Sequence, residues 1–204
     1  MTRLLRALKK NYPDAVCALK HRNAFELLIA TILSAQCTDE RVNRVTPALF
    51  KEYPTPRSLA KAPLSRVEIL IRSTGFFRQK AKSLVASSGI LSEKFGGEVP
   101  RTMDELLSLR GVARKTANVV LGVCYGIAEG VVVDTHVVRL ANRMGFTREK
   151  DPVKIEKDLM GIVPRKDWIW FSHAMITHGR RVCKALSPKC PECPLEKICP
   201  KIGI

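Results

Sequence analysis

The chain has 204 residues, of which 46% are hydrophobic, so it is long enough to bury one ordinary core or two small ones. Its 35 Lys and Arg residues against 19 Asp and Glu give a formal net charge of +16, which indicates a polyanionic partner, either nucleic acid or an anionic membrane surface. No apolar run approaches the roughly 20 residues of a membrane-spanning helix, and residues 1–14 lack the apolar stretch of a secretory signal. We therefore expect no membrane-spanning helix, no secretory signal and no membrane partner.

Helical periodicity runs through nearly the whole sequence. The segment Phe25–Ala35 has apolar residues all round, as a buried helix does. Ser65 with Glu68 predicts a capping box that opens a helix over Arg66–Ser73. A long amphipathic helix is expected over Gln79–Phe95.

Three later helices are predicted from their first residues. Thr102 with Glu105 predicts a second capping box. Asp151, followed by a proline in the first helical position, predicts a helix that runs to about residue 161. Asp167 is expected to cap a helix over Trp168–His178.

A single run, Gly130–Val133, is typical of a strand, and it is too short and isolated to imply a sheet. The sequence shows no repeat and no low-complexity linker. The predicted fold class is therefore all-α.

The segment Leu109–Ala117 (LRGVARKTA) follows one predicted helix and opens the next. Gly111 permits a tight turn with positive φ and a close approach of the backbone to a partner. The unpaired N–H groups at the start of the second helix favour a phosphate, and Arg114 adds positive charge. This pattern indicates a helix-hairpin-helix DNA-binding motif, although an ordinary helix–helix turn with a glycine cap has the same local signature.

Two residues are candidates for chemistry. Lys115 falls in the first turn of the helix after the hairpin, where the helix dipole disfavours a cation, and a neutral amine there is a nucleophile able to form a Schiff base. Asp134 precedes an amphipathic run, which predicts a helix N-cap. Its carboxylate is also suited to stabilising a developing sugar cation, and the two roles are compatible.

The chain has seven cysteines, and four of them occupy its last 22 residues, in the pattern Cys183-x6-Cys190-x2-Cys193-x5-Cys199. An odd total and this clustering argue against a secreted disulfide framework. Zinc usually takes two paired Cys-x-x-Cys knuckles, and one such pair is present. A [4Fe–4S] cluster accepts four cysteines at uneven spacing, so the pattern favours a cluster over zinc. The other three cysteines are expected to be core residues: Cys17, Cys37 and Cys124.

These motifs, in this order, resemble the endonuclease III family of helix-hairpin-helix DNA glycosylases, and the likeness covers essentially the whole chain. The matching segments are Phe25–Asn43, Gly97–Pro100, Leu109–Val120, Val133–Arg139, His178–Arg180 and the cysteine loop.

The resemblance implies two helical lobes and duplex DNA bound across the cleft between them. One is a helical-barrel lobe with the hairpin, over residues 18–128. The other joins the N-terminal helix, residues 1–17, to residues 129–204 with the cluster loop. It also implies a monomer in the cytoplasm, associated with the nucleoid.

Site residues follow from the same resemblance. Lys115 matches the catalytic lysine and Asp134 the catalytic aspartate of the family. Gln36 and Phe76 fall where the family places side chains that fill the gap left by an extruded base. Cys183, Cys190, Cys193 and Cys199 match the ligands of the [4Fe–4S] cluster. The remaining residues expected to contact DNA are Gly111, Ala113, Arg114, His136, Arg180, Lys184 and Lys189.

The chain departs from the family pattern at a few positions. Arg110 stands where proline is usual, and Ala113 where the hairpin usually has its second glycine, so a Cβ lies at the expected phosphate contact. Phe76 stands where leucine is common.

The resemblance implies a bifunctional DNA glycosylase and AP lyase of base excision repair. Adenine-specific relatives lack the lysine and 8-oxoguanine glycosylases lack the cysteine loop, so oxidised pyrimidines are the expected substrates. Three alternatives stay open: a glycosylase for another lesion, a non-enzymatic iron–sulfur module that binds DNA or senses redox state, and a zinc-stapled nucleic-acid binder.

Overall fold

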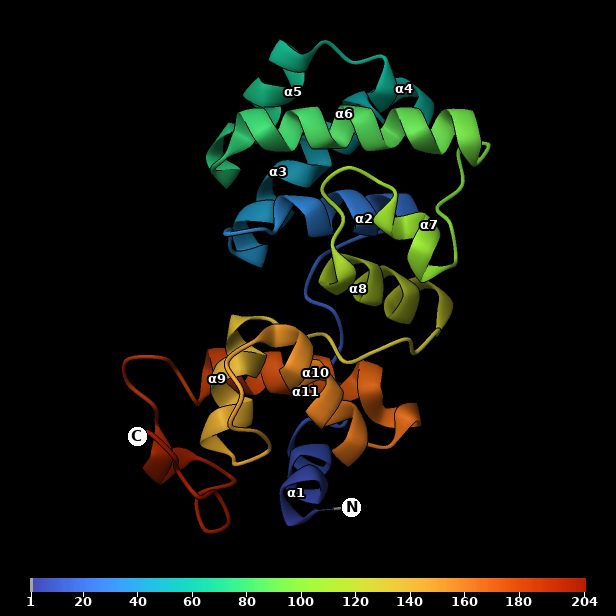
Figure 1. Cartoon of the computed structure of the whole chain (residues 1–204). Coiled ribbons are helices and arrows are strands. Elements are labelled where there is room, and N and C mark those ends of the chain that lie inside the picture. The colour runs from blue at the N-terminus through green and yellow to red at the C-terminus, as the bar shows by residue number, and fades with distance from the viewer. Residues whose placement is uncertain (1) are drawn as a thin grey trace. The chain divides into compact units, whose positions relative to one another are not determined.

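The computed structural model describes residues 2–204, which form eleven α-helices, three short 3-10 turns and no strand (Figure 1). The all-α prediction is therefore confirmed. Contacts divide these residues into two compact units. One is Ala18–Tyr125, and the other joins the residues up to Cys17 to Gly126–Ile204, a division that falls slightly before residue 128. No described helix is long and apolar enough to cross a membrane.

The Ala18–Tyr125 unit is organised around its longest helix, α6, which packs against α2, α4 and α5 (Figure 1). Its helices are α2 (Ala24–Leu33), α3 (Asp39–Glu52), α4 (Pro56–Ala60), α5 (Leu64–Ile71), α6 (Phe77–Lys94), α7 (Met103–Leu107) and α8 (Arg114–Tyr125), with the 3-10 turn η1 (Arg72–Thr74) before α6.

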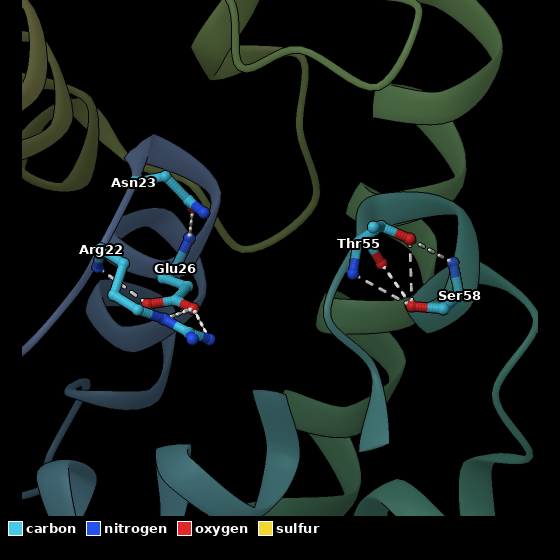
Figure 2. A network of polar contacts seen from close by, with 5 residues as sticks. All are labelled: Arg22, Asn23, Glu26, Thr55 and Ser58. Carbon is cyan, nitrogen blue, oxygen red and sulfur yellow. Dashed lines mark hydrogen bonds and ion pairs between the residues drawn. The ribbon is translucent and has the colours of Figure 1, made fainter. Parts of the chain in front are cut away.

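Helix α2 is the buried helix that its sequence predicts, because every residue from Phe25 to Leu33 is buried. Its first turn is closed by side chains (Figure 2). Asn23 accepts a hydrogen bond from the Glu26 backbone N–H, and the Glu26 carboxylate accepts from both the backbone and the guanidinium of Arg22. The one buried carboxylate of this helix is thus paired.

The predicted capping box of Ser65 and Glu68 is wrong. Helix α5 begins at Leu64, and Pro63 takes the N-cap position without a side-chain hydrogen bond. Because the proline ring already fixes φ near the helical value, the helix begins earlier and Ser65 lies inside its first turn. A capping box that was not predicted, between Thr55 and Ser58, opens α4 (Figure 2).

The second unit has a core lined by α1 (Arg3–Asn11), α9 (Thr135–Arg143), α10 (Pro152–Ile162) and α11 (Trp168–Arg181). The 3-10 turns η2 (Arg165–Asp167) and η3 (Cys190–Glu192) complete it. Leu5 and Leu8 of α1 are buried with Phe171 of α11, and this core extends to Cys183 and Leu195 of the C-terminal loop. The cysteine loop is therefore packed onto the helices.

Two of the three later N-caps are confirmed, because the side chains of Thr102 and Asp151 accept backbone hydrogen bonds at the starts of α7 and α10. In place of the return bond of a capping box, the Thr102 hydroxyl donates to the Glu105 carboxylate at 2.6 Å. Asp167 stands at the N-cap of α11 but makes no capping bond, because η2 places it in a helical conformation and its carboxylate pairs with Lys9. That predicted hydrogen bond is wrong, although the helix begins where expected.

Candidate active site and cysteine pocket

The predicted hairpin links α7 to α8 and lies on helix α6. Leu109 and Val112 are buried, and the Ser87 hydroxyl donates to the Arg110 carbonyl at 2.6 Å. Gly111 has φ +82°, and a Cβ added there would lie 2.9 Å from the Ser83 Cβ. Both the backbone conformation and the contact with α6 thus require glycine at this position.

The second half of the hairpin is exposed and basic. Ala113, Arg114 and Lys115 are all exposed at the start of α8. Ala113 is not among the described non-glycine residues with positive φ, so the turn does not need a glycine there. The departure from the family pattern at residue 113 therefore costs no backbone strain.

Lys115 is the second residue of α8, in the Ala18–Tyr125 unit. Its side chain is exposed, and it lies among the free N–H groups of the first turn. An accessible amine at the positive end of a helix is suited to reaction with an electrophilic sugar carbon once it is neutral.

Asp134 is the N-cap of α9, in the other unit. Its Oδ1 accepts a hydrogen bond from the Val137 N–H at 2.9 Å, which confirms the predicted cap. The strand-like run before it forms no sheet in residues 2–204, since the Val132 N–H donates to the Ser172 hydroxyl at 2.9 Å. The carboxylate is half-buried, so solvent still reaches it.

The two candidate gap-filling residues share an unusual backbone. Gln36 has φ +52° and Phe76 has φ +47°, a left-handed conformation that costs about 1–2 kcal/mol in a residue with a Cβ. Gln36 is exposed just after the C-terminal end of α2, and Phe76 is 68% exposed at the N-cap of α6. Backbone strain at both positions, together with the exposed aromatic ring of Phe76, indicates a function rather than a contribution to stability.

His136 packs closely against α11 at Gly179, where the lack of a side chain leaves space for it. A Cβ on Gly179 would lie 3.0 Å from the His136 Nδ1 and 3.1 Å from the Arg139 guanidinium. Arg139 donates to the carbonyls of Gly179 and Cys183 at 3.1 and 2.9 Å. The segment His178–Arg180 therefore owes its glycine to the close packing of α9 on α11.

The four C-terminal cysteines all line one small pocket. Burial raises the pKa of the Cys193 thiol, and the nearby sulfurs of the other three cysteines add to this rise. Crowded sulfurs become stable as thiolates when a bound cation compensates their charge. The chemistry of this donor set therefore fits a metal centre.

Two of the cysteine sulfurs accept N–H hydrogen bonds, one from helix α9 and one from within the loop itself. Arg143 donates to the Cys183 sulfur at 3.4 Å and to the Lys184 carbonyl at 2.8 Å, and the Leu195 N–H donates to the Cys193 sulfur at 3.4 Å. The ring of His178 lies between Cys193 and Tyr12, with its Nδ1 2.8 Å from the Tyr12 hydroxyl. Burial lowers the pKa of His178 to about 4, so this ring is neutral near pH 7.

The described residues contain no group of three His, Cys, Asp or Glu side chains close enough together to hold a single metal ion. The four sulfurs thus share a pocket without meeting at one point. A polynuclear cluster does not require such a meeting point, because its cysteine ligands bind different iron atoms.

The prediction that the other three cysteines are core residues is wrong. Cys17, Cys37 and Cys124 are each half-buried rather than core residues, and none of them lines the pocket. Cys17 and Cys37 lie outside helices, so the apolar helical setting expected for them was wrong. They belong to neither candidate site.

The predicted basic residues near the cysteine loop are exposed. Arg180 is exposed near the end of α11, and Lys184 is exposed directly after Cys183. Lys189 is exposed as well, with its ammonium 3.3 Å from the Glu192 carboxylate. Arg139 and Arg143 were not singled out from the sequence, because the residues they hold lie about 40 positions away in the chain.

Comparisons with known proteins agree with this geometry. Residues 29–165 match the model of the HhH-GPD superfamily of base excision DNA repair proteins. Endonuclease III of Synechocystis is 55% identical over 98% of this chain and 91% of its own length, and that of Bacillus subtilis is 49% identical over 92% and 86%.

Solved structures agree as well. A non-covalent endonuclease III–DNA complex superimposes with a TM-score of 0.93 at 48% identity, covering 97% of this chain and 92% of its own. A trapped endonuclease III–DNA covalent intermediate gives 0.92 at 49% identity, with the same coverage.

The chain is therefore a base excision DNA repair protein of the HhH-GPD superfamily. Within this superfamily it belongs to the endonuclease III family. The family membership confirms the predicted DNA glycosylase and AP lyase activity and does not favour the non-enzymatic alternative.

Proposed function

We propose that the protein excises oxidised pyrimidines from duplex DNA with Lys115 as nucleophile and then cleaves the strand 3′ to the abasic site. The observation that carries this proposal is the exposed Lys115 in the first turn of α8, directly after a hairpin whose glycine is fixed by packing. The chain's +16 charge supports binding to the phosphate backbone, which is salt-dependent and independent of sequence.

Recognition begins at the backbone. The amides around Gly111 and Ala113, together with Arg114, would hold phosphates at the hairpin. Basic residues around α9 and the cysteine loop would contact the duplex as well: His136, Arg180, Lys184 and Lys189. Extrusion of the damaged base costs a few kcal/mol, which a lesion lowers, and Gln36 and Phe76 would fill the vacated space.

The chemistry requires one amine and one carboxylate. The neutral amine of Lys115 attacks C1′ of the sugar, and the bond from C1′ to the base breaks as the base leaves with the electron pair and takes up a proton. Asp134 would stabilise the positive charge that develops on the sugar and accept a proton from the attacking amine. The C1′–O4′ bond then breaks, O4′ takes up a proton, and the opened sugar is left joined to Lys115 through an imine at C1′.

The imine makes the C2′ protons acidic. Loss of one of them lets electrons move into the C2′–C3′ bond, and the C3′–O bond breaks with departure of the 3′ phosphate. Water then hydrolyses the imine and releases Lys115. This β-elimination accounts for an AP lyase that needs no second nucleophile.

We further propose that Cys183, Cys190, Cys193 and Cys199 hold a [4Fe–4S] cluster. The shared pocket, the donor set and the N–H groups directed at the sulfurs support this assignment. The cluster would supply a rigid core for the basic C-terminal loop. In this view the protein acts as a monomer on DNA and is associated with the nucleoid.

A lesion panel tests the substrate class. Single-turnover assays would compare duplexes carrying thymine glycol, an oxidised purine, an alkylated purine or a normal base. We expect rapid excision of thymine glycol and little reaction with the others. A preference for either purine lesion would overturn the proposed substrate class while leaving the lyase chemistry intact.

A further inference from the structure

The two strained loops that carry Gln36 and Phe76 are joined by one buried side chain. Lys80 is only 6% exposed on helix α6. Its ammonium donates to the Leu33 carbonyl at 2.8 Å and to the Thr74 carbonyl at 2.8 Å. Since both oxygens bond the same nitrogen, the two carbonyls lie close to each other.

Each of these carbonyls lies just before one of the left-handed residues. Leu33 is the last residue of α2, and its carbonyl is one of those that the helix itself leaves without a partner. Thr74 ends η1, two positions before Phe76. The Lys80 backbone N–H donates to the Phe76 carbonyl at 3.1 Å as an ordinary bond of the first turn of α6, so Lys80 lies one helical turn after Phe76.

A buried ammonium is an expensive way to satisfy two carbonyls. No carboxylate pairs with Lys80 in the hydrogen bonds of the described chain, and burial lowers the pKa of its amine. Loss of the ammonium would leave the Leu33 and Thr74 carbonyls without this donor, which destabilises the fold to some extent. Because both carbonyls belong to the segments that carry Gln36 and Phe76, the same loss is also expected to change what the two loops do.

We propose that Lys80 is a positioning residue that fixes the Gln36 and Phe76 loops relative to each other, so that both side chains enter the duplex together. The proposal rests on the gap-filling role proposed above for Gln36 and Phe76. A rigid pair places both side chains before the base leaves the stack, whereas independent loops would have to be ordered during extrusion. Loss of the bridge is expected to slow the step that opens the duplex, with little effect on phosphate contacts.

The test uses Lys80→Met, which keeps the length and apolar body of the side chain but removes the ammonium. Lys94→Met is the matched control, because Lys94 is the exposed last residue of the same helix. The 18 residues of α6 at ~1.5 Å each place it about 27 Å from Phe76 along the helix axis.

Two readouts separate positioning from folding. The first is the fluorescence of 2-aminopurine placed opposite a stable abasic analogue, which reports filling of the gap. The second is the split between kcat and KM on thymine glycol duplex. For Lys80→Met we expect a folded protein with a lower melting temperature, because two buried carbonyls lose their donor, together with an unchanged KM, loss of the fluorescence change and a kcat lower by on the order of 100-fold. The Lys94→Met control should match the wild type in both.

Gln36→Ala and Phe76→Ala are measured in parallel. If these variants lose the fluorescence change and Lys80→Met keeps it with full kcat, the positioning role of Lys80 is wrong and the gap-filling assignment stands. If both alanine variants retain full fluorescence and kcat, the gap-filling assignment itself fails, and the Lys80 proposal fails with it. If Lys80→Met does not fold, Lys80→Gln replaces it, since its amide reaches at most one of the two carbonyls, and the same outcomes decide.

Discussion

At the scale of single residues, Asp134 shows how a structural and a chemical role share one side chain. Its carboxylate caps α9 through the Val137 N–H, and the same half-buried group is the proposed partner of the reacting sugar. An amide oxygen caps a helix about as well as a carboxylate but carries no charge. The two roles are therefore separable by substitution.

We expect Asp134→Asn to keep its thermal stability while excision of thymine glycol falls by roughly 100-fold or more, the usual contribution of a proton-transferring group. Asp134→Ala should in addition lose about 1 kcal/mol of stability with the cap. Melting curves and single-turnover rates measure the two effects. Asp151→Asn and Asp151→Ala are matched controls, because Asp151 caps α10 in the same way. An unchanged excision rate in Asp134→Asn would remove the carboxylate from the chemistry.

The sequence predicts the cap at Asp134 because capping depends on neighbours within one helical turn. It does not predict the left-handed backbone of Gln36 and Phe76, since neither residue favours positive φ by itself. Nor does it predict that Lys80 is buried, because its partner Leu33 lies 47 residues away. The catalytic roles of Lys115 and Asp134 came from the family resemblance and remain proposals.

At the scale of elements, the hairpin depends on its packing against α6 as much as on its own turn. Gly111 has φ +82° with Ser83 directly beside it, whereas Gly97 has φ +87° with nothing within 4 Å of an added Cβ. Alanine at either position is destabilised by the left-handed backbone conformation. Only alanine at position 111 would also clash with Ser83. The pair therefore separates backbone strain from steric contact.

We expect Gly97→Ala to lower the free energy of unfolding by about 1–2 kcal/mol and to leave DNA affinity unchanged. Gly111→Ala should lose a further ~1–3 kcal/mol from the contact with Ser83 and should also weaken binding to undamaged duplex, because the hairpin shifts. Chemical denaturation and fluorescence anisotropy measure the two quantities. Equal effects of the two substitutions on both measurements would contradict the role assigned to the packing of the hairpin on α6.

The helices themselves are largely predictable. Periodicity predicts α2 and α6, and local caps predict α7 and α10. Two predicted caps were wrong because of the residues that precede the helix. Pro63 moves the start of α5 forward, and the 3-10 turn η2 places Asp167 in a helical conformation before α11. Likewise, the spacing of the cysteines indicates a metal site, while the arginines that brace their loop belong to α9 and become visible only in the fold.

At the scale of the whole molecule, the cysteine pocket belongs to one unit and the hairpin to the other. The core of the unit that contains the pocket includes Cys183 and Leu195, so a cluster in the pocket would contribute to folding of that unit. Substitution of a cysteine in the pocket is thus expected to change the iron content, and substitution of Lys115 is expected to leave it unchanged.

The purified wild type should contain iron and acid-labile sulfide and be coloured, as a [4Fe–4S] protein is. In Cys193→Ser we expect loss of iron and colour and a lower melting temperature. Cys124→Ser is the matched control, because this half-buried cysteine does not line the pocket. Iron and sulfide analysis with thermal melting gives both results. A colourless wild-type protein that contains zinc would contradict the cluster assignment.

The central claim is that Lys115 forms a covalent imine with damaged DNA, and borohydride trapping tests it most directly. The wild type, Lys115→Gln and Lys94→Gln would each be mixed with duplex DNA carrying one thymine glycol, reduced, and separated on a denaturing gel. We predict a covalent protein–DNA complex with the wild type and with Lys94→Gln and none with Lys115→Gln. A complex of equal yield in Lys115→Gln, or none in a wild type that still binds the duplex, would contradict the account.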